Sequence, residues 1–215
     1  TGSIVDVAKV IELTKSNSNA LIYVDAVHLA PHQLIDVQAL GCDFLVSSAY
    51  KYFGPHLGVL FAKAQHLNEL SPDKVAPAKN INPNRWETGT QNYEAMAGLS
   101  ATVDYLSSLA GVEGGSRRDK LETAFQNIAI YEHELSRLFL NKINAYPQIT
   151  LYGIKDKGRL NERTPTFAFT IKGVNPRAVS EFFGAHYVCI WDGHFYAPGL
   201  INQLGLTESG GVIRV

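Results

Sequence analysis

The stretch Ala20-Leu21-Ile22-Tyr23-Val24-Asp25 is a short, continuous apolar run that ends on an acid, which is typical of a strand buried on both faces. Asp43-Phe44-Leu45-Val46-Ser47-Ser48 predicts a second strand, and Gly58-Val59-Leu60-Phe61-Ala62 predicts a third. Between the first two, residues 35–40 predict a short helix closed by Gly41, because glycine readily adopts the left-handed conformation that follows many helices. Strand, helix and strand with short links indicate an open α/β sheet.

The flanking segments extend this pattern into two regions. Helical spacing of apolar residues predicts three further helices, over residues 4–14, 93–109 and 121–143. Later segments predict short strands and one proline-initiated helix, at residues 149–152, 166–171, 176–184, 188–191 and 213–215. Glycines cluster between Gly111 and Ser116, which indicates a domain boundary. We therefore predict part of a large domain with a mainly parallel sheet and helices over residues 1–113, and a small α+β domain over residues 114–215.

Composition and charge exclude several classes of function. The chain has 215 residues, 46% of them apolar, and a net charge of −1, which is ordinary for a soluble globular protein. No basic cluster indicates nucleic-acid binding, and no apolar run reaches the roughly 18–20 residues of a membrane span. The first residues lack the basic start and apolar core of a signal peptide. Cys42 and Cys189 lie far apart and form no CxxC motif, so we expect two buried structural thiols and a cytoplasmic protein.

The ends of the chain indicate a fragment. The first residue is Thr1 rather than Met, and the chain ends on Ile213-Arg214-Val215, which alternates as a strand does. A strand rarely ends a domain without a following cap or tail. We therefore expect the chain to be cut at both ends, and the sheet to lack strands and leave apolar surface open.

Two residues that can carry chemistry follow the first two predicted strands. Asp25 ends the first strand and Lys51 follows the second, and functional residues of open α/β sheets lie at the carboxyl ends of strands. Taken alone, such an aspartate is often a turn former and such a lysine is usually solvated. Together they fit pyridoxal 5′-phosphate (PLP), which needs a lysine for a Schiff base and an acid against its pyridine nitrogen. Hydroxyl groups near the lysine can bind its phosphate.

Four blocks of sequence carry a family resemblance. They are Val24-Asp25-Ala26-Val27-His28, Asp43 to Lys51, Gly54-Pro55 with Gly58-Val59-Leu60, and Arg85-Trp86-Glu87-Thr88-Gly89-Thr90-Gln91-Asn92. In this order and spacing they resemble the cofactor region of the cysteine desulfurase-like and class V aminotransferase family, with its Asp-Gly-Ala-Gln, Ser-Gly-His-Lys, Gly-Pro and Arg-Phe-Glu-Ala-Gly-Thr-Pro-Asn motifs. The likeness continues to Val215 and so covers nearly the whole chain. It implies the C-terminal portion of a PLP-dependent enzyme of fold type I.

The resemblance implies a role for each matching residue near the cofactor. Lys51 would form the aldimine with PLP and move the alpha proton, while Asp25 would pair with the pyridine nitrogen. His28 stands where the family has a glutamine that bonds the cofactor's phenolic oxygen, and histidine can donate the same bond. Ser48 would bind the phosphate, and Tyr50 stands where the family has a phosphate-binding histidine.

Three further residues are implied in binding beyond the lysine region. Thr90 would reach the phosphate of the other subunit, which implies a homodimer. Arg214 would bind the carboxylate of a small amino-acid substrate, a task suited to a bidentate guanidinium. His194 matches a histidine of the family's mobile catalytic loop and is expected to help bind substrate.

Each of these residues also has a structural interpretation. His28 could be a histidine with its hydrogen bonds satisfied at a helix entrance. Thr90 follows a glycine and could cap the helix that is predicted from residue 93. Arg214 could be an ordinary strand residue. The residues alone leave these alternatives open.

One loop departs from the family pattern. The family carries a nucleophilic cysteine within Arg-Thr-Gly-His-His-Cys-Ala, and the matching stretch here is Trp191-Asp192-Gly193-His194-Phe195-Tyr196-Ala197. Tyr196 occupies the cysteine position, and a phenol cannot take up sulfur as a thiolate does. We therefore expect no persulfide-forming activity. The family's N-terminal half, which supplies a residue stacked on PLP and a phosphate-binding loop, is not found in this chain.

Two hypotheses of different classes follow. The chain is a PLP-dependent enzyme, or a fragment of one, acting on a small amino acid through Lys51 by elimination, transamination or epimerisation. Alternatively, it is a non-catalytic protein that keeps the fold for a structural or interaction role. A third class, a metal hydrolase, would have to use histidines such as His32 and His56. Neither an HExxH motif nor a Cys/His zinc spacing is present in the sequence, so we expect no metal site.

Overall fold

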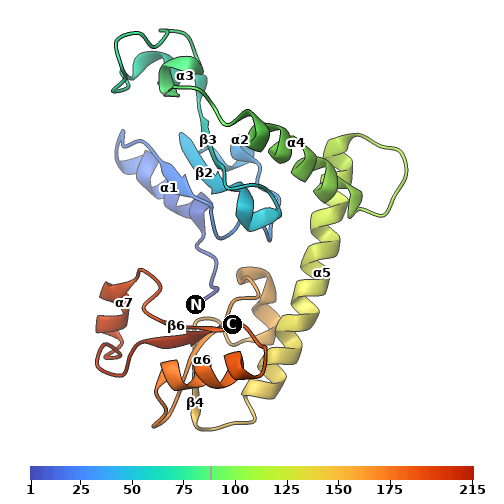
Figure 1. The fold of residues 1–215 in the computed structure, drawn as a ribbon, viewed down its shortest axis with the longest axis vertical. Helices are drawn as coiled ribbons and strands as arrows, with labels where there is room; N and C mark the ends of the chain where they lie inside the picture. Colours follow the sequence, from blue (N-terminus) through green and yellow to red (C-terminus); the bar gives the residue numbers. More distant parts are fainter. Residues whose placement is uncertain (88) are drawn as a thin grey trace. The chain divides into compact units, whose positions relative to one another are not determined.

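The computed structural model describes residues 1–87 and 89–215, so Thr88 of the quoted motif lies outside the described residues. The chain forms two compact units, one made of residues 6–129 and the other of residues 1–5 with 130–215. A single helix, α5 (Arg117–Ile143), contributes residues to both (Figure 1). Because this helix is continuous, the division into units does not test the boundary predicted near residue 113, which stays a prediction.

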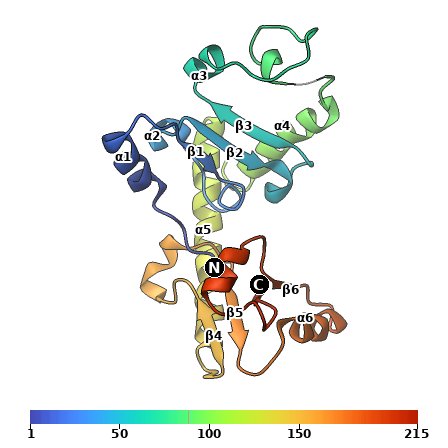
Figure 2. The ribbon, with the colours of Figure 1, turned by 90° about the vertical axis from the view of Figure 1, so that its left-hand side faces the viewer.

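The first unit is built on a three-stranded sheet whose strands lie in the order β1-β2-β3 (Figure 2). The strands are β1 (Tyr23–Asp25), β2 (Phe44–Ser48) and β3 (Gly58–Ala62). β1 pairs with β2 in parallel, and β3 pairs with β2 in antiparallel orientation, so the described sheet is mixed. The other elements of this unit are α1 (Val7–Asn17), α2 (Val37–Leu40), α3 (Ala64–Glu69), α4 (Tyr93–Ser108) and the 3-10 helices η1 (Ala49–Tyr52) and η2 (Asn84–Trp86). The predicted α/β class is confirmed.

Burial of the first strand was predicted wrongly. Tyr23 in β1 is 59% exposed, whereas the strand was expected to be buried on both faces. The reason is its position, because within the described sheet β1 pairs only with β2 and forms an edge. The apolar core of this unit lies further inside and includes Ile11, Ala26, Cys42 and Leu45.

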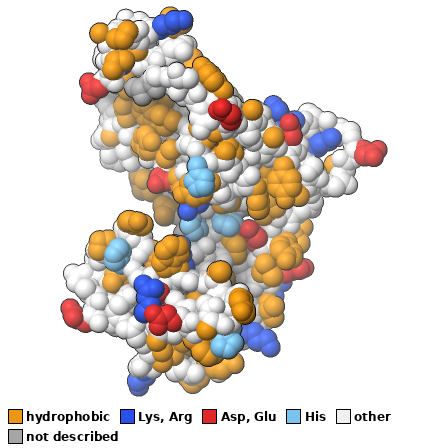
Figure 3. All heavy atoms as spheres, in the orientation of Figure 1, with side chains coloured by type: hydrophobic (Ala, Val, Ile, Leu, Met, Phe, Trp, Pro, Cys, Tyr) orange, Lys and Arg blue, Asp and Glu red, His pale blue; other side chains and the backbone are white. Residues whose placement is uncertain are grey.

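Apolar side chains are also visible on the surface of both units (Figure 3). In the first unit, Phe53 is 70% exposed and Leu60 is 51% exposed.

The second unit contains a four-stranded antiparallel sheet in the order β4-β5-β7-β6. The strands are β4 (Ile149–Tyr152), β5 (Ala168–Ile171), β6 (Trp191–Gly193) and β7 (Val212–Arg214). Its helices are α6 (Pro176–Ala185), α7 (Pro198–Gln203) and the 3-10 helix η3 (Lys157–Glu162). Leu140 and Ile143 of α5 pack with Phe167 and Ile213 in its core.

Two predictions for this unit were wrong. A strand was expected over residues 188–191, but β6 begins only at Trp191 and ends at Gly193. Cys189 therefore lies before the strand and is exposed, whereas Cys42 is buried as expected. The apolar neighbours of Cys189 do not bury it, because Val188 is itself 45% exposed and Trp191 is 67% exposed.

Arg163 explains why the first five residues belong to the second unit. Its side chain donates hydrogen bonds to the carbonyl oxygens of Ile154, Thr164 and Thr166, and burial lowers its pKa to about 10. Residue 163 also forms a β-bridge with Ser3, and the N–H of Thr164 donates to the carbonyl oxygen of Gly2 at 2.8 Å. These contacts hold the N-terminal segment against the loop that precedes β5.

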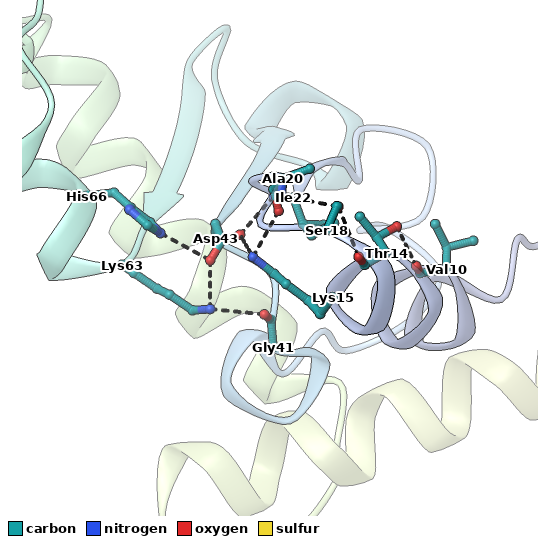
Figure 4. A network of polar contacts seen from close by, with 10 residues as sticks. All are labelled: Val10, Thr14, Lys15, Ser18, Ala20, Ile22, Gly41, Asp43, Lys63 and His66. Carbon is teal, nitrogen blue, oxygen red and sulfur yellow. Dashed lines mark hydrogen bonds and ion pairs between the residues drawn. The ribbon is translucent and has the colours of Figure 1, made fainter.

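A buried charge network joins several segments of the first unit (Figure 4). The carboxylate of Asp43, whose side chain is 4% exposed, accepts hydrogen bonds from Lys15 at 2.7 Å, Lys63 at 2.9 Å and His66 at 3.1 Å. It also accepts one from the N–H of Ile22 at 2.8 Å. Burial alone would raise the pKa of Asp43, but these donors outweigh it and hold the pKa well below its usual range. Asp43 therefore remains ionised and links α1 and α3 to the residues that directly precede β2 and follow β3.

Gly211 allows β6 and β7 to lie side by side at one end. A Cβ at this position would lie 2.3 Å from the carbonyl oxygen of Gly193, and its φ of +89° is left-handed. Gly211→Ala is expected to lower the free energy of unfolding, measured by urea denaturation, by about 3 kcal/mol or more, since clash and strain add. Gly173→Ala is the control, because Gly173 has a φ of +75° but no atom within 4 Å of its Cβ position. It should cost only about 1–2 kcal/mol. Equal losses in both variants would show that the clash is relieved at no cost.

Candidate active site

The parallel pairing of β1 and β2 brings the predicted cofactor residues to one edge of the sheet. Asp25 is in register with Val46, and Ser48 ends β2 two residues further on. η1 follows at once and carries Tyr50 and Lys51. The carboxyl ends of both strands therefore meet at the edge where ligands bind in open α/β sheets.

Asp25 is exposed and only partly engaged. Its Oδ1 accepts a hydrogen bond from the N–H of Val27 at 2.9 Å, which fixes the turn after β1. The N–H of Ala26 continues the ladder by donating to the carbonyl oxygen of Val46 at 2.9 Å. Oδ2 has no hydrogen bond within the described residues, so one carboxylate oxygen is free to accept from a ligand.

His28 lies in the turn that follows Asp25. The side chain is exposed and its ring centroid is 5.8 Å from that of His32. Residues 27–32 form turns, so the helix entrance that one interpretation assumed is not present. His28 has interactions within the chain, and its position directly after Val27 keeps it close to Asp25 along the backbone.

Lys51 is exposed on η1, and its main described contact is aromatic. Its Nζ lies 5.4 Å from the centroid of the Tyr50 ring, and Lys51 makes no hydrogen bond or ion pair within residues 1–87 and 89–215. Tyr50 in turn stacks on His56, with ring centroids 4.9 Å apart and planes at 11°. This stacking could not be predicted from the sequence, because Tyr50 and His56 do not have a helical or strand spacing to one another.

The backbone around Lys51 is held from both sides. The N–H of buried Ala49 donates to the carbonyl oxygen of Leu57 at 2.8 Å, and the N–H of Gly54 donates to that of Ala49 at 2.8 Å. A Cβ on Gly54 would lie 2.9 Å from Ala49, so the tight turn needs glycine. The loop between β2 and β3 therefore presents Lys51 from a fixed backbone.

Thr90 is exposed and does not cap the following helix. Asn92 is the N-cap of α4, because its side chain accepts a hydrogen bond from the N–H of Ala95 at 3.0 Å. The capping interpretation of Thr90 is therefore wrong. Two residues before the undescribed Thr88, Trp86 donates from Nε1 to the carbonyl oxygen of Leu67 at 3.0 Å, which ties this loop to α3.

The substrate-binding candidates lie in the second unit. Arg214 in β7 is partly buried, burial lowers its pKa, and its Cζ lies 4.2 Å from the ring centroid of Phe195. Nδ1 of exposed His194 accepts a hydrogen bond from the N–H of Tyr196 at 3.1 Å. Tyr196 is 98% exposed, and both Phe195 and Tyr196 have a left-handed backbone, with φ of +50° and +59°. Phe195 was not singled out from the sequence.

The polar groups at the sheet edge fit PLP. Asp25 offers a free carboxylate oxygen, Ser48 a hydroxyl without a hydrogen bond in the described residues, and Lys51 an amine without a carboxylate partner there. These are the groups that the pyridine nitrogen, the phosphate and the aldehyde of PLP require.

Among the described residues, no group of three or more His, Cys, Asp or Glu could hold a metal ion. No helix in the described ranges is both long and apolar enough to cross a membrane.

Comparisons with known proteins agree with this geometry. The sequence pattern of the family described as Aminotransferase class-V matches residues 1–215. An aminotransferase-like protein of Gibberella zeae is 29% identical, over 100% of this chain and 51% of its own length. A cysteine desulfurase of Klebsiella pneumoniae is 31% identical, over 86% of this chain and 44% of its own length.

Solved structures show the same fold. The apo structure of a cysteine desulfurase from Thermococcus onnurineus matches with a TM-score of 0.78 at 23% identity, over 100% of this chain and 51% of that one. The Escherichia coli cysteine desulfurase CsdA matches with a TM-score of 0.76 at 23% identity, over 98% of this chain and 49% of that one.

The chain belongs to the class-V aminotransferase family, as the sequence resemblance implied. Its similarity to cysteine desulfurases extends over both compact units. The chain spans about half the length of the relatives it matches.

Proposed function

We propose that this chain is part of a PLP-dependent enzyme that acts on a small amino acid, with Lys51 as the lysine that binds the cofactor. The observation that carries the proposal is the parallel register of β1 and β2, which sets Asp25, Ser48 and Lys51 along one sheet edge. Membership of the class-V aminotransferase family supports it. We also propose residues 1–113 and 114–215 as the large and small domains, and a cytoplasmic location remains a prediction from the sequence.

Each residue at this edge would have a defined task. Asp25 would hold a proton on the pyridine nitrogen, so that PLP, when bound, supplies an electron sink for the substrate's alpha carbon. His28 would donate a hydrogen bond to the phenolic oxygen, and Ser48 would donate to the phosphate, with Tyr50 beside it. Lys51 would take the alpha proton from the substrate. Thr90 would bind the phosphate held by a second copy of the chain in a homodimer.

Arg214 and His194 would bind the substrate. A partly buried guanidinium binds a carboxylate through two parallel hydrogen bonds, which suits the common group of all amino acids. Because Tyr196 occupies the position of the family's nucleophilic cysteine, the reaction we propose is elimination, transamination or epimerisation rather than persulfide formation. The exposed Cys189 lies outside that loop and does not replace the missing thiol.

A non-catalytic role is the second candidate. It is favoured by the loop of residues 193–197, where a fully exposed phenol replaces the nucleophile. Retention of both Asp25 and Lys51 opposes it, since a structural protein needs neither.

Mixing the purified chain with PLP tests the proposed function. We expect a visible absorbance band that borohydride abolishes, followed by a PLP label on the peptide that contains Lys51 in mass mapping. A label spread over many surface lysines, or no band, would contradict the cofactor site in this chain.

A further inference from the structure

The guanidinium group of Arg214 has no hydrogen-bonding partner among the described residues. Within the described part of the chain it makes no hydrogen bond and no ion pair, although the side chain is partly buried and burial lowers its pKa. A guanidinium offers five N–H donors, and none of the Arg214 nitrogens is both buried and unpartnered, so its donors reach solvent. An arginine in this state can satisfy its donors with an anion from outside the chain.

The contact that this side chain does make is with an aromatic ring. The Cζ atom of Arg214 lies 4.2 Å from the ring centroid of Phe195, well within the range of a cation–π contact. The alternation of side chains along β7 explains why Arg214 contacts Phe195. Ile213 is fully buried in one core cluster, so Val212 and Arg214 point to the opposite face of β7, where Phe195 packs.

Phe195 is itself held in place. Its ring packs against the cluster of Ala168, Ile201 and Val212. Its backbone is left-handed, and the loop around it is closed by a hydrogen bond of 2.8 Å from the N–H of Ala197 to the carbonyl oxygen of His194. The ring is therefore partly buried and held against this cluster.

A ring against one face of a guanidinium leaves the edge of the plane open. The N–H groups lie in that plane, and a carboxylate can approach them there through two parallel hydrogen bonds. A flexible aliphatic neighbour would leave the plane free to rotate.

We propose that Phe195 is a positioning residue, which holds the guanidinium of Arg214 in the orientation that binds a carboxylate. This inference rests on the proposed function, because it gives the substrate-binding arginine its geometry. Phe195 acts through Arg214 and does not itself bind the carboxylate. The expected ligand is the planar carboxylate of an amino acid.

Nitrogen-15 NMR of the whole chain, titrated with sodium acetate against sodium chloride of equal ionic strength, tests this. In the unmodified chain we expect the Arg214 Nε–H signal to be shifted by the ring and to move on addition of acetate. Phe195→Leu should lose the ring shift and weaken acetate binding about two- to fivefold, the factor expected for a partly exposed cation–π contact. Phe195→Tyr keeps the ring and should bind acetate as the unmodified chain does.

Phe182→Leu is the matched control, because Phe182 is 61% exposed and its ring contacts among the described residues are with Phe183 and His186. Its acetate affinity should be unchanged. Equal acetate affinity in the Phe195→Leu variant, or no acetate response of Arg214 in the unmodified chain, would overturn the inference. Failure of the cofactor proposal is recognised separately, because PLP labelling of Lys51 does not depend on this titration.

Discussion

Lys51→Ala is expected to abolish the covalent PLP label entirely. The alanine variant has no amine at this position, and the reducible bond requires one. The fold should survive, because Lys51 is exposed and its described contact is the Tyr50 ring at 5.4 Å. A cation–π contact at an exposed site contributes about 0.5–1 kcal/mol, so the free energy of unfolding should change by no more than that. The label is measured by mass spectrometry after borohydride and the stability by urea denaturation.

Lys79→Ala is the matched control for this variant. Lys79 is also an exposed lysine of the first unit, with no hydrogen bond or ion pair in the described residues. This control should keep the full label at residue 51. If the Lys51→Ala chain keeps a reducible band of unchanged intensity, another lysine binds the cofactor and the assignment is wrong.

Asp43→Asn is expected to lower the free energy of unfolding by about 2–4 kcal/mol. Removing one partner of a buried ion pair costs about 3–5 kcal/mol, because it leaves the other charge uncompensated. The value here is lower because the side chains of Lys15 and Lys63 are 38% and 41% exposed and reach water. The amide also cannot accept all four hydrogen bonds that the carboxylate accepts. Urea denaturation measures the change.

Glu12→Gln is the control for Asp43→Asn. Glu12 accepts a hydrogen bond from Lys9 at 2.8 Å, but both side chains are more than half exposed. Such a surface pair contributes little, so the change should stay within about 0.5 kcal/mol. A loss from Asp43→Asn no larger than this would mean that water replaces the network without cost.

The pH dependence of stability follows from the same carboxylate. The pKa of Asp43 is lowered in the folded chain, so its contribution is complete above the unfolded value of about 3.9 and is lost as the pH falls further. The urea midpoint of the unmodified chain should therefore fall steeply below about pH 4. The Asp43→Asn chain should show a flatter decline over the same range.

Elements set by local sequence were predicted closely. β3 begins and ends at the predicted residues, Gly58 and Ala62, and β4 does so at Ile149 and Tyr152. Gly41 follows α2 in the left-handed conformation, with φ of +76°. These features depend on neighbours in the chain, on apolar runs and on the freedom of glycine, which the sequence displays directly.

Features set by tertiary contacts were not predicted. The exposure of β1 depends on which strands pair with it, and β6 starts later than expected because its register is set by β7. Asp43, Lys15 and Lys63 lie far apart in the sequence, and no spacing relates them. Their meeting depends on how α1, β2 and β3 pack.

The candidate site shows the same division. Asp25, Ser48 and Lys51 could be assigned because parallel strands end at one edge, whatever the details of packing. The aromatic partners could not. His56 against Tyr50 and Phe195 against Arg214 depend on loop conformations that no periodic pattern encodes.

The continuity of α5 has a consequence for how the protein unfolds. The helix has 27 residues and is about 40 Å long, and the division between the units falls within it, after Ala129. Leu140 and Ile143 pack in the core of the second unit, and Ala124 and Phe125, in the part of the helix that belongs to the first unit, are also buried. Helix formation is cooperative, so unfolding of either unit removes packing contacts that stabilise α5. The loss of helix would in turn destabilise the other unit. We expect a single heat-absorption peak in calorimetry, and a cut between residues 129 and 130 should split it into two.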